Sequence, residues 1–242
     1  MQLGSQTSLS VLAELSWPLI PAGNRIRYIW QEWLQDHLQD YHGGGILLTL
    51  DSLTQSLSMP DRGFELQLKV GPGLAHSVHA EPESLPVDAD SIQAAVVSFG
   101  FDYTQTGSVL LGEIHRALEP QGLLYSLLLA PNNPWCLKSK VGLSDPRKLL
   151  PQQSIGLNRF NDWLGLLGFE IDEVETLACP WWRGFSHFQK TSEMNKAWLS
   201  APIAYMIKAQ KKVATMNPIK PLEKESTVAI GAMANLSTKQ SC

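Results

Sequence analysis

Residues 94–130 read AAVVSFGFDYTQTGSVLLGEIHRALEPQGLLYSLLLA, and this segment carries the strongest structural pattern in the chain. Its two ends, Ala94–Phe99 and Leu123–Ala130, are short and almost wholly apolar, as in strands that are buried on both faces of a sheet. Between them, apolar residues recur at helical spacing at Val109, Leu110, Ile114, Ala117 and Leu118. The segment therefore predicts a strand, a helix and a second strand, the unit from which parallel sheets are built.

The same alternation extends in both directions from this segment. Amphipathic patterns predict helices over residues 25–41 and 157–168. Short apolar or alternating runs predict further strands at Ile46–Leu50, Phe64–Val70, Ser77–Ala80, Phe169–Leu177 and Ala201–Lys212. The last strand is apolar first and basic at its end, which predicts that its end runs out into solvent. Strands that alternate with helices indicate an α/β fold with a Rossmann-like, doubly wound, mostly parallel sheet and helices on both faces.

The chain divides into three regions that differ in their pattern of apolar and polar residues. Residues 1–42 hold the first amphipathic pattern and are predicted to form an N-terminal helical extension. Residues 43–216 carry the alternating strands and helices and are predicted to form the main domain. Residues 217–242 are polar and aperiodic, so we expect this tail to be disordered.

The composition argues against several classes of function. A net charge of -4 over 242 residues offers no basic surface for non-specific nucleic-acid binding. No run approaches the roughly 18 apolar residues that a membrane-spanning helix needs. The three cysteines are widely spaced and form no CxxC pair, so we expect no metal site. The first residues lack the basic start of a secretory signal, so we expect a soluble cytoplasmic protein.

Side chains that directly follow the predicted strands are the candidates for a binding site. In doubly wound sheets, ligands bind beyond the carboxyl ends of the strands, near the point where the strand order reverses. The candidate positions are Asp51 and Ser52 after the first strand, Glu81 and Pro82 after the third, and Ser98, Phe99 and Asp102 after the fourth.

Two further segments carry a family resemblance when taken in order: AEPESLPVDADSIQAAVVSF at 80–99 and LLGEIHRALEPQGLLYSLLLAPNNP at 110–134. Their order resembles that of class I S-adenosylmethionine-dependent methyltransferases of the small-molecule, methyltransferase type 11-like kind, and it is similar to a little-characterised bacterial branch of them. The similarity covers about residues 43–220. The positions that fall into the family register are Leu85, Pro86, Asp90, Ser91, Glu113, Arg116, Leu118, Pro120 and Gly122.

The resemblance implies roles for the candidate residues, with S-adenosylmethionine as cofactor and a small molecule as substrate. Asp51, followed by Ser52, stands at a glycine position of the family, and its carboxylate is a candidate to bind the cofactor's ammonium group. Glu81 stands where an acid accepts a hydrogen bond from the adenine amino group, but Pro82 has no backbone N–H to give to the ring. Ser98 and Phe99, at the end of the fourth strand, are candidates to contact the cofactor. Asp102 is a candidate for a catalytic base.

Two departures from the family pattern keep a second hypothesis open. Leu53 and Gln55 stand where the family has glycines that let the backbone approach the cofactor. The end of the second strand offers Lys69, Val70 and Gly71, where the family has an acid for the ribose hydroxyls. The sequence therefore predicts either a methyltransferase for a small molecule or a catalytically degenerate relative that serves as a binding or interaction module.

Overall fold

A computed structural model gives the structure of the chain. It describes residues 15–39, 41–60, 63–71, 78–80, 84–140, 148–149, 151, 154–180, 189–193 and 200–212. The candidate residues Glu81 and Pro82 and the predicted tail, 217–242, lie outside the described residues.

The described strands form one mixed sheet of eight strands in the order β3-β2-β1-β4-β5-β8-β6-β7. The five strands from β3 to β5 run parallel to their neighbours. β8 lies antiparallel between β5 and β6. The strands are β1 (Ile46–Leu50), β2 (Leu66–Gly71), β3 (Val78–His79), β4 (Ile92–Ser98), β5 (Leu118–Leu129), β6 (Phe169–Pro180), β7 (Gln189–Lys190) and β8 (Ser200–Lys211).

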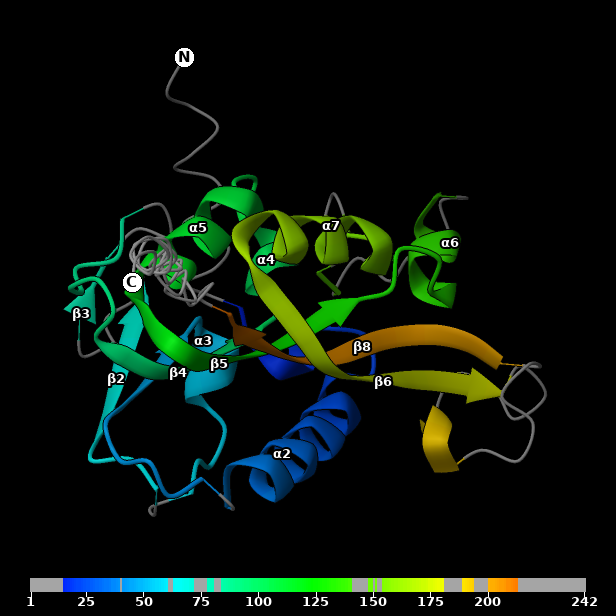
Figure 1. The fold of residues 1–242 in the computed structure, drawn as a ribbon. Coiled ribbons are helices and arrows are strands. Elements are labelled where there is room, and N and C mark those ends of the chain that lie inside the picture. The colour runs from blue at the N-terminus through cyan, green and yellow to red at the C-terminus, as the bar shows by residue number, and fades with distance from the viewer. Residues whose placement is uncertain are drawn as a thin grey trace, which may run out of the picture.

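Helices cover both faces of this sheet, as Figure 1 shows: α2 lies against one face, and α5 and α7 lie against the other. The predicted doubly wound α/β fold is therefore confirmed. The helices are η1 (Trp17–Leu19), α2 (Gly23–Gln39), α3 (Ser52–Gln55), α4 (Gly100–Tyr103), α5 (Gly107–Ala117), α6 (Pro134–Lys140), α7 (Leu157–Leu167) and η3 (Thr191–Glu193).

The core has two halves because successive side chains of a strand point to opposite faces. On β1, Leu47 packs in the half under α2, and Leu48 packs in the half under α5 and α7. On β4, Val96 and Val97 divide in the same way. Because both faces of these strands are buried, the side chains on both faces are mostly apolar, and the sequences are continuous apolar runs.

The segments on either side of the end of β5 differ from the prediction. β5 begins at Leu118 rather than at Leu123, because Leu118 already pairs with Ile92 of β4 ahead of an irregularity in the register. Between β5 and α7, where the sequence predicts no element, the structure also has a helix, α6. Asn133 explains its start, since the Oδ1 atom accepts the backbone N–H groups of Trp135 and Cys136.

Candidate functional site

The strand order reverses between β1 and β4, and two candidate residues meet there. Asp51 follows β1 directly, and Ser98 is the last residue of β4. The Asp51 Oδ2 atom accepts the backbone N–H of Ser98 at 2.8 Å. The crevice at this reversal is the place where ligands bind in doubly wound sheets. The structure therefore brings Asp51 and Ser98 together at the expected position.

Asp51 is held in a buried polar network. Its Oδ1 atom accepts the backbone N–H of Thr54 at 2.7 Å, which caps α3, and its Oδ2 atom accepts the Thr54 hydroxyl at 3.1 Å. The Ser98 hydroxyl lies 2.8 Å from that of Thr54 and accepts the indole N–H of Trp30 at 2.8 Å. Burial raises the pKa of Asp51 to about 7, against the lowering effect of the hydrogen bonds from Thr54 and Ser98.

The loop after β1 is a buried helical turn. α3 begins at Ser52, whose side chain is half-buried, and Leu53 points into the core with no exposed surface. Trp17 covers this turn: its indole N–H donates to the Leu53 carbonyl at 3.1 Å and to the Ser56 hydroxyl at 2.8 Å. A glycine loop would leave this space to a ligand, whereas here the chain's own side chains fill it.

Phe99 closes the crevice from the β4 side. Its side chain is fully buried, and its ring meets that of Trp17 edge-on at 6.1 Å between centroids. Both residues have a positive φ: Phe99 is in the left-handed conformation with φ of 62°, and Asp51 has φ of 70° with an extended ψ of 155°. Such conformations are rare and costly for residues other than glycine, and they cluster at functional sites.

Asp102 lies in α4, away from solvent, with only 3% of its surface exposed. Its Oδ2 atom accepts the backbone N–H of Leu129 at 2.8 Å, and its Oδ1 atom accepts that of Ile155 at 3.0 Å. Burial raises the pKa of Asp102 to about 7. Its hydrogen bonds join the end of β5 to the segment before α7, so they stabilise the fold. A catalytic role for Asp102 stays a prediction.

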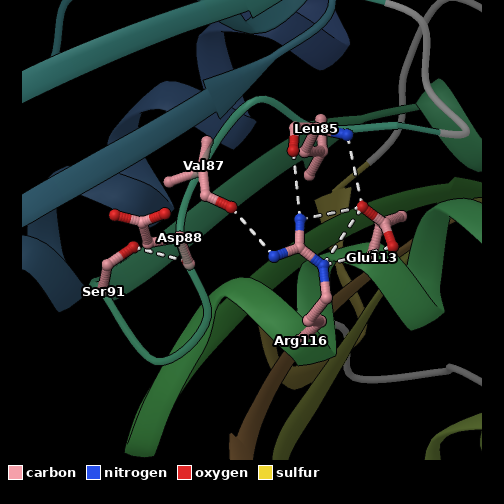
Figure 2. Close-up of polar contacts among 6 residues, drawn as sticks. All are labelled: Leu85, Val87, Asp88, Ser91, Glu113 and Arg116. Carbon is pink, nitrogen blue, oxygen red and sulfur yellow. Dashed lines mark hydrogen bonds and ion pairs between the residues drawn. The ribbon is translucent and has the colours of Figure 1, made fainter.

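Glu113 and Arg116 of α5, two positions that match the family pattern, together hold the loop before β4 (Figure 2). The Arg116 guanidinium donates to the carbonyls of Leu85 at 3.0 Å and Val87 at 2.9 Å, and it pairs with Glu113 at 2.9 Å. Glu113 in turn accepts the backbone N–H of Leu85 at 3.2 Å. Glu113 and Arg116 are one helical turn apart, and this spacing lets both side chains bind the same loop.

Sequence reasoning missed Trp17 and Trp30 as residues of this site. Trp30 belongs to the apolar stripe of α2, where its indole N–H gives no sequence signal. Trp17 precedes the helix, in a segment that has no period of its own. Only the polar partners of the two rings, Ser98 for Trp30 and Leu53 for Trp17, reveal their positions.

No protein-family model matches the chain, and a search of curated proteins finds no match. Solved structures do match. The S-adenosylmethionine-dependent methyltransferase of Thermotoga maritima aligns with a TM-score of 0.53 at 15% identity, over 78% of this chain and 90% of that one. The strand order and the antiparallel pairing of β8 with β5 are further evidence for the fold, beside this structural match.

The chain has the class I methyltransferase fold.

Further structures agree with this assignment of the fold. Geranyl diphosphate C-methyltransferase from Streptomyces coelicolor, solved with S-adenosyl-L-homocysteine, aligns with a TM-score of 0.53 at 14% identity over 87% of each chain. The YcgJ protein of Bacillus subtilis aligns with a TM-score of 0.52 at 12% identity, over 77% of this chain and 99% of that one. At identities of 12 to 15%, the similarity to methyltransferase structures shows the fold alone.

Among the described residues, no three His, Cys, Asp or Glu side chains gather into a group that would hold a metal ion. In the same part of the chain, no helix is both long and apolar enough to cross a membrane.

The raised pKa of Asp102 gives a prediction about pH. A carboxyl group whose pKa is higher in the folded than in the unfolded protein contributes stability below about pH 4 and loses it as the pH rises toward 7. Asp102→Asn removes this titration and leaves one backbone N–H without its acceptor, at a cost of about 1–3 kcal/mol. We expect the variant to be less stable than the parent at pH 4.5, and this deficit to shrink by pH 7.5.

Urea denaturation at several pH values measures these free energies of unfolding. The matched control is Asp162→Asn, an exposed position on α7. A deficit of Asp102→Asn that stays constant from pH 4.5 to 7.5 would contradict the raised pKa.

Proposed function

We propose that the chain is an S-adenosylmethionine-dependent methyltransferase that acts on a small molecule. The class I methyltransferase fold supports this proposal. The observation that carries it is the position of Asp51, which joins the ends of β1 and β4 at the reversal of the strand order. The costly backbone conformations of Asp51 and Phe99 at the same place are a second support.

The Asp51 carboxylate could bind the ammonium group in the amino-acid part of the cofactor. Thr54 and Ser98 donate three hydrogen bonds to the Asp51 carboxylate, and a backbone hydrogen bond from Leu53 also lowers its pKa. An ammonium group would therefore replace one of these donors. Asp51 would hold that group, and the half-buried Ser52 at the start of α3 would border it. S-adenosylmethionine supplies an electrophilic methyl group when it is bound.

The alternative is a catalytically degenerate protein that uses the same fold as a binding or interaction module. Two observations favour it. The side chain of Leu53 is fully buried where a glycine would admit the cofactor. Val70 and Gly71, which end β2, are both buried and offer no carboxylate to a ribose. This alternative predicts no binding of S-adenosylmethionine at millimolar concentration.

Calorimetric titration of the full chain with S-adenosylmethionine and S-adenosylhomocysteine distinguishes the two functions. The methyltransferase proposal predicts binding of both. It also predicts that Glu81→Ala weakens binding by roughly 10- to 150-fold, the cost of one charge-assisted hydrogen bond. Glu83→Ala, two residues along, is the control and should bind like the parent. Equal affinities of the parent and Glu81→Ala would remove Glu81 from the site, and no binding at all would favour the alternative.

A further inference from the structure

The N-terminal strap, Leu15–Ile20, contacts the segments that follow β1 and β4, at the reversal of the strand order. Trp17 of the strap is 2% exposed and contacts both sides of the crevice. On the β1 side, its indole N–H donates to Leu53 and Ser56, and on the β4 side its ring packs against Phe99. Leu15 and Ile20 are buried as well. Asp51, which caps the turn that Trp17 contacts, is itself only 6% exposed.

A second segment holds the outer side of the strap. The backbone N–H of Leu149 donates to the Leu19 carbonyl at 2.8 Å, and the Lys148 ammonium donates to the Pro18 carbonyl. The Tyr103 hydroxyl donates to the Leu149 carbonyl at 2.9 Å, which ties this segment to α4. The strap therefore depends on a few hydrogen bonds and on apolar contacts, and no sheet ladder contains it.

The joint between the strap and α2 is strained and tightly packed. Ala22 has a φ of 54°, a left-handed conformation that is unfavourable for a residue with a side chain. At Gly23, a Cβ atom would lie 2.0 Å from the carbonyl oxygen of Trp17. Because any side chain at position 23 must push Trp17 away, the closed position of the strap requires this glycine.

We propose that the N-terminal strap is a lid that closes the cofactor position and must move out before a ligand reaches Asp51. The proposal rests on the proposed function. Trp17 and Leu53 both fill the crevice, but they are held differently. Leu53 belongs to α3, which Asp51 caps, whereas Trp17 belongs to a segment outside the sheet with a strained joint beside it.

The lid makes the apparent affinity depend on how often it is open. When only a small fraction of the molecules is open, the apparent dissociation constant rises in inverse proportion to that fraction. Changes that favour the open position therefore tighten binding without adding any contact to the ligand. Gly23→Ala should act in this way by displacing the Trp17 carbonyl, and Trp17→Ala by removing the indole. Gly112→Ala is the matched control, because a Cβ there meets nothing within 4 Å.

The test uses the full chain and two measurements. Calorimetry gives the affinity of each variant for S-adenosylhomocysteine, and we expect a gain of at least tenfold for Gly23→Ala and Trp17→Ala and no change for Gly112→Ala. Backbone hydrogen exchange of the strap in the parent, with and without S-adenosylhomocysteine, needs no variant. We expect ligand to speed the exchange of residues 15–20 while it slows that of residues 51–56.

The outcomes separate the lid from the function. If the parent binds S-adenosylhomocysteine while its strap keeps the same exchange rates, and folded Trp17→Ala binds no better, the lid is overturned and the methyltransferase proposal stands. If neither the parent nor any folded variant binds, the proposed function is overturned together with the lid. Circular dichroism identifies variants that do not fold.

Discussion

Lys211→Met is expected to lower the free energy of unfolding by about 3 kcal/mol. The Lys211 ammonium, at the end of β8, is buried and donates to the carbonyls of His115 and Leu118 at 2.9 and 2.6 Å and to Asp90 at 2.7 Å. Both carbonyls lie at the end of α5, where helix carbonyls lack partners and the helix dipole favours a cation. Methionine keeps the apolar stem but leaves these acceptors unpaired, at about 1–3 kcal/mol for each buried group.

Lys212→Met is the matched control for this prediction. Its ammonium lies one residue further along, on an exposed side chain 3.5 Å from Glu170. Exposed ion pairs contribute at most about 1 kcal/mol, so this variant should unfold close to the parent. Chemical denaturation of both variants measures the difference. Equal losses would show that Lys211 has no special role at the end of α5.

The position of Lys211 also shows where the sequence misleads. A strand that turns basic at its end predicts a solvent-exposed end, and this prediction is wrong for Lys211, which is 6% exposed. The carbonyls that hold its ammonium come from residues more than 90 positions earlier in the chain. Such a partner is set by the packing of β8 beside β5, and no local pattern contains it.

Most elements of the fold are predictable because their signal is local. β1 spans the predicted Ile46–Leu50, and α7 ends before Gly168, whose φ of 83° suits only glycine well. These limits follow from apolar periodicity and from turn residues within a few positions. The reversal between β1 and β4, which locates Asp51 and Ser98, follows from the same strand order.

The contents of the candidate site are less predictable, because they depend on tertiary contacts. The sequence identifies Leu53 as a departure from glycine, but it does not reveal that Trp17 covers Leu53 or that Trp30 binds Ser98. The residues in contact are 36 and 68 positions apart. Asp51 illustrates the difference: its place was predictable from the strand, whereas its closed network was not.

The double variant Asp51→Gly, Leu53→Gly is expected to have the largest effect, a loss of about 5 kcal/mol or more. Removing the buried Leu53 side chain leaves a cavity, which costs about 2–5 kcal/mol. Removing the carboxylate leaves the backbone N–H groups of Thr54 and Ser98 unpaired, at about 1–3 kcal/mol each. Relief of the positive φ at Asp51 returns only about 1–2 kcal/mol.

This loss is comparable to the whole stability of an ordinary domain, about 5–15 kcal/mol, so we expect the double variant to be largely unfolded. Gln55→Gly is the matched control, because it adds a glycine to the same turn at a half-buried side chain and should cost about 1 kcal/mol. Thermal unfolding followed by circular dichroism compares the two. A double variant as stable as Gln55→Gly would mean that Leu53 and Asp51 do not hold the turn. The expected collapse would mean that the buried Leu53 side chain and the hydrogen bonds of Asp51 hold the turn, so that these two changes alone cannot introduce a glycine loop here.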